Sequence, residues 1–190
     1  QMAQAGLFEE VERLLDVGNF IDFMILNQYG GNTDWDYHNW FAVLDHKTTD
    51  GFRFVCWDCE GVFINVNDNV LDLDSKGKPT ALFKRLMGNP DFRARFAARV
   101  NELSQPGGIL TQERTVAIWD SLYHSIDKAL YLEAARWGDY RYAVHQYASA
   151  GRRYDVDYWY MRERDRLMGE YFPYRLPVYL QQLRDKGWYE

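Results

Sequence analysis

The sequence has no excess of basic residues and no long hydrophobic run, and each absence excludes a class of function. It carries 22 Lys and Arg against 28 Asp and Glu, a formal net charge of −6. Broad nucleic-acid binding requires cations that neutralise phosphates, so we expect no nucleic-acid partner. No apolar run approaches the ~20 residues that cross a bilayer, so we predict no membrane span in this segment.

Proline is scarce too, with five residues, while hydrophobic residues make up 47% of the chain and charged residues 26%. This composition is typical of a folded globular chain and not of a disordered one. The 190 residues are predicted to form a single domain, 1–190. Aromatic residues reach 17%. We expect most of them in the core, and a surface that stacks on sugars or a peptide is the second interpretation.

Only two cysteines occur, Cys56 and Cys59, in the order Cys-Trp-Asp-Cys. A zinc site needs a second pair of such ligands, and the sequence has no further cysteine. A redox motif needs a strand followed by a helix, and the residues after Cys59 do not begin one. We therefore predict structural thiols, which in a strand would point to opposite faces.

Hydrophobic periodicity predicts a mostly helical chain with one small sheet. Residues 7–17 and 19–29 have helical patterns, and the second helix is expected to end at a cap formed by Gly30-Gly31. Residues 39–45 and 52–58 are rich in aromatic and β-branched side chains and flank an Asp-Gly turn, which predicts a hairpin within a small sheet element near 39–64. Further helices are predicted from Pro79 onward. One runs over about 90–103, with Asn89 as its N-cap and an apolar face of Phe92, Phe96, Val100 and Leu103. Others run over about 111–130, 139–149, 156–171 and 176–186, with Gly151 and Pro173 as breaks.

Two further segments carry more specific expectations. The helix that begins near Thr111 is expected to bury an apolar face formed by Trp119, Leu122, Tyr123, Ile126, Ala129 and Leu130. The polar loop 65–78 has Asn and Asp at alternate places, as calcium loops do. No register supplies both the glycine and the glutamate that a calcium loop requires, so we expect an ordinary loop.

Acidic and amide side chains gather at the open end of the predicted hairpin. Asp34 lies in the preceding loop, Asn39 begins the first strand five residues later, and Asp58 ends the second strand. The ends of paired strands lie side by side, so Asn39 and Asp58 are expected to approach one another. Kinases use this order: an Asp that orients the substrate hydroxyl, then an Asn and an Asp that hold Mg²⁺ against the phosphates. Glu60 would add a second carboxylate at the metal. The alternative is that the acids are solvated turn residues.

The most specific residues are Asn32-Thr33-Asp34-Trp35, Asn39-Trp40 and the strand Phe52-Arg53-Phe54-Val55-Cys56-Trp57-Asp58. They resemble the C-terminal half of the CotH kinase family, the spore-coat atypical protein kinases and their bacterial relatives. The resemblance continues in LFKRLMGNPDFR at 82–93, in Arg136-Trp137-Gly138 and in LQQLRDKGWY at 180–189. It implies a kinase-like fold and ATP-dependent phosphorylation of Ser-rich proteins. Asp34 would be the catalytic residue, Asn39 and Asp58 would bind the cofactor, and Asn39, Asp58 and Glu60 would hold the metal.

Two departures from the family pattern limit what this chain is expected to do alone. Glu60 stands where the family has an Asp, and its longer arm alters the metal geometry. No lysine precedes Asp34 to pair with phosphates, no glycine-rich loop is present, and residues 1–31 are too few for a five-stranded lobe. We therefore expect the C-terminal lobe of a longer protein, inactive alone. ATP and Mg²⁺ are expected for the intact parent only, and the partners are the N-terminal lobe of the same parent chain and a Ser-rich protein substrate.

Together these patterns predict an α+β fold, mostly α: a kinase-like C-lobe with one small hairpin and a helical C-terminal two-thirds. The alternative function is a pseudokinase-like scaffold or binding domain in a cell-surface protein, which Glu60 and the aromatic surplus would fit. A carbohydrate-binding module is a third class and rests on Trp and Tyr abundance alone. The location stays open, with the cell surface or another extracytoplasmic site favoured.

Overall fold

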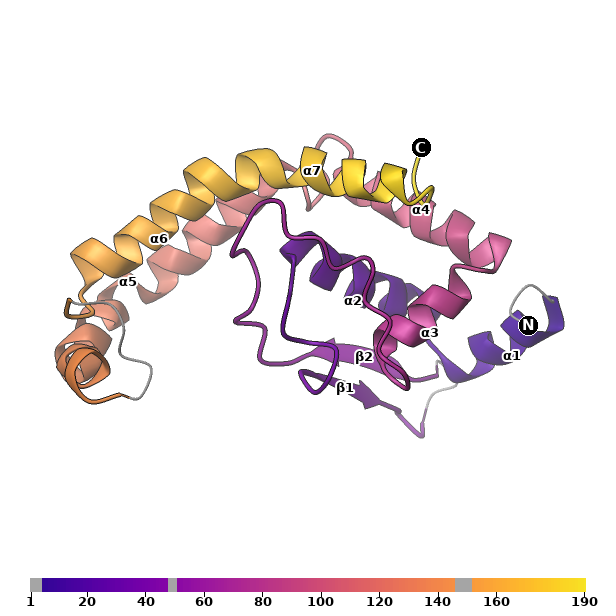
Figure 1. Cartoon of the computed structure of the whole chain (residues 1–190), viewed down its shortest axis with the longest axis horizontal. Helices are drawn as coiled ribbons and strands as arrows, with labels where there is room; N and C mark the ends of the chain where they lie inside the picture. The colour runs from indigo at the N-terminus through magenta and orange to yellow at the C-terminus, as the bar shows by residue number, and fades with distance from the viewer. Residues whose placement is uncertain (1–4, 48–50, 146–151) are drawn as a thin grey trace.

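The computed structural model describes residues 5–47, 51–145 and 152–190. It confirms the α+β class with mostly helical content: a two-stranded antiparallel sheet accompanies a larger set of helices (Figure 1). Three parts of the predicted elements lie outside the described residues: positions 48–50 of the predicted turn, positions 146–149 of the helix predicted over 139–149, and the predicted break at Gly151.

Helices α1 (Ala5–Leu14) and α2 (Val17–Gly30) open the fold. Asp16 caps α2, because its carboxylate accepts a hydrogen bond from the Asn19 N–H at 2.9 Å. Gly31 ends the helix in the left-handed conformation, with φ of 59°, which confirms the predicted glycine cap. Most of α2 is buried, so its sequence shows no distinct polar face.

The predicted hairpin is confirmed as strands β1 (Trp40–Val43) and β2 (Arg53–Cys56), with Trp40 opposite Cys56 in the antiparallel register. The paired region is shorter than the predicted element at 39–64. The side-chain amide of Asn19 on α2 pairs with the backbone of β2, donating to Phe54 O at 3.2 Å and accepting from Phe54 N–H at 2.6 Å. The sheet is thereby joined to α2 through an amide that satisfies backbone groups of β2.

Helices α3 (Pro79–Leu86) and α4 (Pro90–Ser104) follow a polar loop. Asn89 caps α4 as predicted: its side-chain oxygen accepts hydrogen bonds from the N–H groups of Asp91 and Phe92 at 2.9 and 3.0 Å. Phe92 and Phe96 are fully buried. The predicted apolar face of this helix therefore does meet the core.

The C-terminal half forms two long helical runs. Helix α5 (Gln112–Ala143) continues through the boundary predicted near residue 139, which was wrong. The second run has no break: π-helix η1 (Val156–Tyr160), α6 (Met161–Arg166), π-helix η2 (Leu167–Tyr171) and α7 (Phe172–Asp185) follow one another directly. Pro173 was predicted to end a helix, and it lies instead in the first turn of α7. A proline is tolerated in a first turn, and the π turn before it relieves the clash of its ring with the preceding turn.

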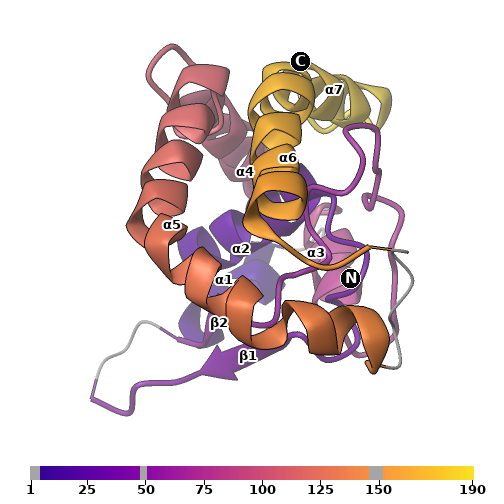
Figure 2. The ribbon, with the colours of Figure 1, turned by 90° about the vertical axis from the view of Figure 1, so that its left-hand side faces the viewer.

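The apolar face predicted for α5 is largely not buried. Tyr123 is covered, whereas Leu122 and Ile126 are 56% and 49% exposed. The reason is that α5 packs mainly against α7 and η1, so side chains that do not face these elements stay exposed. Figures 1 and 2 show α5 and α6 side by side, extending together away from the sheet. None of the described helices has the length and the apolarity needed to cross a membrane.

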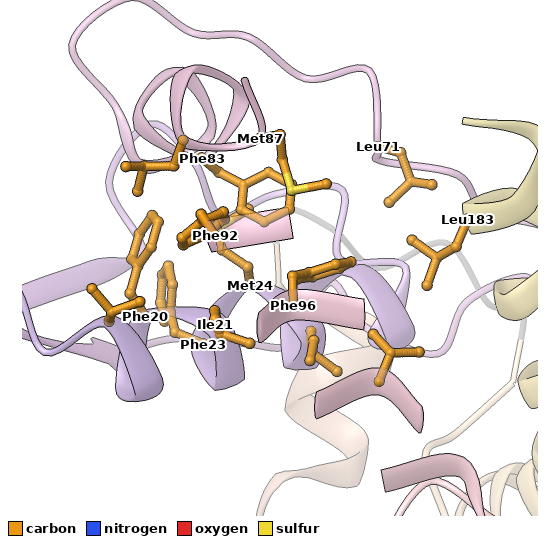
Figure 3. Close-up of a cluster of buried hydrophobic side chains, with 14 of the residues drawn as sticks. Phe20, Ile21, Phe23, Met24, Leu71, Phe83, Met87, Phe92, Phe96 and Leu183 are labelled. Carbon is orange, nitrogen blue, oxygen red and sulfur yellow. The ribbon is translucent and has the colours of Figure 1, made fainter. Parts of the chain in front are cut away.

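The main core lies between α2, α4 and α7, and aromatic rings fill much of it (Figure 3). Phe83 packs edge to face against Phe96, with ring centroids 5.2 Å apart, and Phe23 packs in the same manner against Trp35 at 5.3 Å. Trp35 belongs to the loop that follows α2. The core therefore reaches the segment that carries the candidate functional residues.

Candidate functional site

Asn39 joins the two chain segments that carry the predicted site. Its side-chain Nδ2 donates to the backbone oxygen of Asp34 at 2.7 Å and to that of Asp58 at 3.3 Å. The backbone oxygen of Asn39 accepts from the Trp57 N–H at 3.2 Å. Asn39 is 4% exposed. The structure thus brings the segments of Asp34, Asn39 and Asp58 together, with the amide nitrogen turned toward the backbone and the amide oxygen Oδ1 left for another partner.

A glycine lets the two segments approach closely. The Thr33 N–H donates to Gly61 O at 3.4 Å, and a Cβ on Gly61 would lie 3.4 Å from Asp34 Cβ and 3.1 Å from Asn32 Oδ1. Asn32 is buried and accepts from the Asp34 N–H at 3.2 Å, while its Nδ2 donates to Asn27 Oδ1 at 2.9 Å. This chain of amides fixes the backbone of Asp34 to α2. The sequence reading missed Asn27, Asn32 and Gly61 as positioning residues.

The carboxylates of Asp34, Asp58 and Glu60 are exposed. Within the described part of the chain, no salt bridge or hydrogen bond engages any of the three side chains. Asp58 has φ of 51°, in the left-handed region that costs a non-glycine residue free energy. The loop therefore presents carboxylate oxygens to solvent around a buried amide, and a cation could use those oxygens as ligands.

Asp36, two residues from Asp34, has a different role. It is 3% exposed, and its carboxylate accepts from the Thr80 N–H at 3.1 Å and from the Thr80 hydroxyl at 2.6 Å. Its backbone oxygen accepts from Trp40 Nε1 at 3.0 Å, and Lys78 Nζ donates to Tyr37 O at 2.7 Å. Asp36 therefore fixes the loop to the start of α3. Sequence spacing gave no signal that distinguished it from Asp34.

A buried arginine fixes the end of α2, where the candidate loop begins. Arg175 of α7 is fully buried and donates to Gln28 O, Tyr29 O and Val66 O at 2.6 Å and to Asp68 O at 3.0 Å. Burial lowers the pKa of the Arg175 guanidinium. Carbonyls at a helix C-terminus carry partial negative charge, so a cation there is favourably placed. Arg175 was also not singled out from the sequence.

The two cysteines lie at the end of β2 and just beyond it. Cys56 ends β2, and Cys59 lies in the segment that follows, which forms no strand. The prediction that they point to opposite faces assumed that the strand continues to Cys59, and it does not. Burial raises the pKa of the Cys56 thiol to about 11 and also raises that of Cys59.

The residues present could hold a magnesium ion whose other ligands are phosphates and water. Within the described ranges, no three His, Cys, Asp or Glu side chains are grouped so as to hold a metal by themselves. Mg²⁺ usually takes one or two protein carboxylates, and substrate phosphates and waters complete its shell. Asp58 and Asn39 Oδ1 could supply that small set, with Glu60 close in sequence.

An aspartate loop, an asparagine, a short hairpin and a strand-end aspartate form the layout of protein-kinase sites. The comparison with family models agrees with this class: the family described as "CotH kinase protein" matches residues 2–168. The chain therefore belongs to the CotH kinase family, as the resemblance of its hairpin predicted. No curated protein and no solved structure matches the chain.

Proposed function

We propose that this chain supplies the catalytic aspartate and the metal ligands of a kinase whose intact form transfers phosphate from ATP to a Ser- or Thr-rich protein. In this proposal Asp34 accepts the proton of the substrate hydroxyl, Asn39 Oδ1 and Asp58 hold Mg²⁺ with ATP, and Glu60 adds a carboxylate at the metal. The bound metal would neutralise charge that develops on the phosphates during transfer.

One observation carries the proposal: Asn39 joins the backbones of Asp34 and Asp58, while the carboxylates of both have no partner among the residues that the structure describes. Other carboxylates of the chain are neutralised by cations, as Asp22 is by Arg99 at 2.7 Å and Asp16 by Arg53 at 3.2 Å. A divalent cation bound at this loop could take such carboxylates as ligands.

The residues of this chain would have separate roles in the transfer. Within the described ranges Asp34 is held through its backbone alone, so its carboxylate is available for the hydroxyl proton. Asn39 cannot take up a proton, so it can bind metal without competing for the proton that Asp34 receives. In the transfer, the bond from the γ-phosphorus to its bridging oxygen breaks, a bond to the substrate oxygen forms, and the hydroxyl proton passes to Asp34.

A lysine that pairs with the phosphates is not part of this set, since the first lysine of the sequence is Lys47. We propose that it comes from an N-terminal lobe of the same parent chain, and that the present chain is inactive without that lobe. The chain would still contain the metal ligands, so metal binding can be measured on the 190-residue protein itself.

The test is Mn²⁺ binding in the presence of ATP, followed by electron paramagnetic resonance. Asp58→Ala should weaken Mn²⁺ binding by about tenfold or more, since even residues that only orient metal ligands have effects of that size. Glu10→Ala is the matched control, because Glu10 is an exposed acid on α1, away from the site. Equal affinity in the wild type, Asp58→Ala and Glu10→Ala would show that the ion binds nonspecifically, and the proposal would fail.

A non-catalytic scaffold is the second candidate, and Glu60 is the residue that favours it. A longer acid in place of the family's Asp could weaken metal binding enough to stop transfer. Labelled ATP separates the two functions in the full-length parent: incorporation that is lost in Asp34→Ala excludes the scaffold. No incorporation, together with Mn²⁺ affinity that Glu60→Asp restores, would favour it.

A further inference from the structure

The backbone that follows Asp58 is held by an arginine from 102 and 103 positions further along the chain. Arg166, the last residue of α6, donates to Phe63 O at 2.7 Å and to Ile64 O at 3.2 Å. The same guanidinium pairs with Glu163 of its own helix, through Nε at 2.8 Å and Nη2 at 2.6 Å. Glu163 therefore orients the guanidinium, and the remaining N–H groups are free to bind the two carbonyls.

Phe63 has a backbone conformation that needs such support. Its φ is 60°, in the left-handed region that a bulky residue seldom adopts. Its ring packs edge to face against Tyr171 at 5.3 Å and Phe172 at 5.4 Å, where η2 meets α7. Its N–H donates to Gly30 O at 2.8 Å. A strained residue persists only when its surroundings fix it, and such residues gather at functional sites.

The backbone before Phe63 is held by longer hydrogen bonds. Asp58 O accepts from Asn39 Nδ2 at 3.3 Å. Gly61 O accepts from the Thr33 N–H at 3.4 Å. Both distances exceed the usual range for such bonds, whereas the bonds at Phe63 lie within it. The turn at Phe63 is therefore the firmest attachment of the segment that carries the candidate metal ligands.

We propose that Arg166 is a positioning residue of the candidate metal site. By holding the turn at Phe63, it fixes where Asp58 and Glu60 place their carboxylates. Arg166 acts through the backbone, since its own side chain is engaged by Glu163 and by two carbonyls. Its effect on metal binding rests on the proposed function, whereas its hold on the backbone does not.

Arg164 offers a matched control on the same helix. Its side chain is 28% exposed, against 29% for Arg166, and it also pairs with a neighbouring acid, Asp165, at 2.7 Å. The Arg164 guanidinium lies over the ring of Tyr123 on α5, 5.1 Å from the centroid. Replacing either arginine with methionine removes one cation and one ion pair. Among the contacts of the described residues, Arg166→Met alone of the two also removes donors from the backbone near the site.

The first experiment measures amide hydrogen exchange on the whole chain, without metal. Peptides that cover residues 58–64 should exchange at least about threefold faster in Arg166→Met than in the wild type. Arg164→Met should exchange at the wild-type rate there, and equal exchange in the two variants would overturn the proposal. Should Arg166→Met fail to fold, as judged by circular dichroism, Glu163→Gln takes its place. That variant keeps the side-chain volume and removes the charge that orients Arg166.

The second experiment measures Mn²⁺ affinity in the presence of ATP, by electron paramagnetic resonance. Arg166→Met should weaken binding by about tenfold, as changes to groups that orient metal ligands do. Arg164→Met should leave the affinity unchanged. If the loss of affinity merely follows the melting temperature in both variants, Arg166 is only structural and the positioning role is wrong. If the wild type binds no Mn²⁺ while exchange still separates the two variants, the proposed function fails and the hold of Arg166 on the backbone stands.

Discussion

Replacing Arg175 with methionine tests how α2 and the candidate loop are held. Its guanidinium donates to the backbone oxygens of Gln28, Tyr29, Val66 and Asp68, and its side chain is fully buried. Arg175→Met removes this donor from four backbone oxygens, two buried and two partly buried, at about 1–3 kcal/mol for each acceptor left unsatisfied. Removing a desolvated charge offsets part of that loss. We therefore expect the free energy of unfolding to fall by about 3–5 kcal/mol, a large share of the 5–15 kcal/mol typical of a domain.

The assay is equilibrium urea denaturation followed by far-ultraviolet circular dichroism. Arg175→Lys should lower the free energy of unfolding by roughly half as much. The lysine ammonium retains the charge, but it cannot reproduce the planar set of N–H donors of the guanidinium. The control is Arg153→Met, which removes a salt bridge to Asp139 between side chains that are each 71% exposed, and should cost below about 1 kcal/mol. If Arg175→Met costs no more than Arg153→Met, then Arg175 does not hold the end of α2, and the reasoning is wrong.

Three further changes have defined outcomes. Gly138→Ala should lower the melting temperature, because a Cβ there would lie 2.3 Å from Tyr154 O, whereas Gly169→Ala, with nothing within 4 Å, should not. Burial raises the pKa of Tyr29 and Tyr171 to about 12, above the ordinary 10.0. Stability should therefore be intact below about pH 10 and fall as the pH rises toward 12, on the order of 2–3 kcal/mol for each tyrosine. Urea midpoints at several pH values measure this decline, and Tyr171→Phe should make it less steep; an equal slope would contradict the assignment. Phe96→Ala should cost about 3–5 kcal/mol in the same urea assay, because its ring is fully buried.

Local signals predicted much of the fold. The glycine cap at Gly31, the asparagine cap at Asn89 and the hairpin all occur, because the groups that form them lie within a few residues of one another. The α+β class and the family followed from the same segments. Residues next to one another in sequence determine these features, so no knowledge of distant contacts was needed.

Predictions that depended on distant contacts were less successful. Residue spacing predicted an apolar face on α5, but spacing does not say which helix will pack against that face. Helix α5 packs mainly against α7 and η1, and Leu122 and Ile126 stay exposed. Pro173 was read as a break, whereas the π turn before it allows the helix to continue. The strand that carries Cys56 was expected to continue to Cys59, whereas β2 ends at Cys56.

The candidate site shows the same division. The sequence by itself determined which residue types stand at 34, 39 and 58, and that a hairpin separates the second from the third. Only the tertiary structure decided that Asn39 donates to both neighbouring segments and that Arg175 holds the helix before them. It also decided that Asp36 is bound to Thr80, whereas the Asp34 side chain has no partner in the described part of the chain. The physical reason is that a buried polar group must find a partner, and those partners lie on other elements, far away in the sequence.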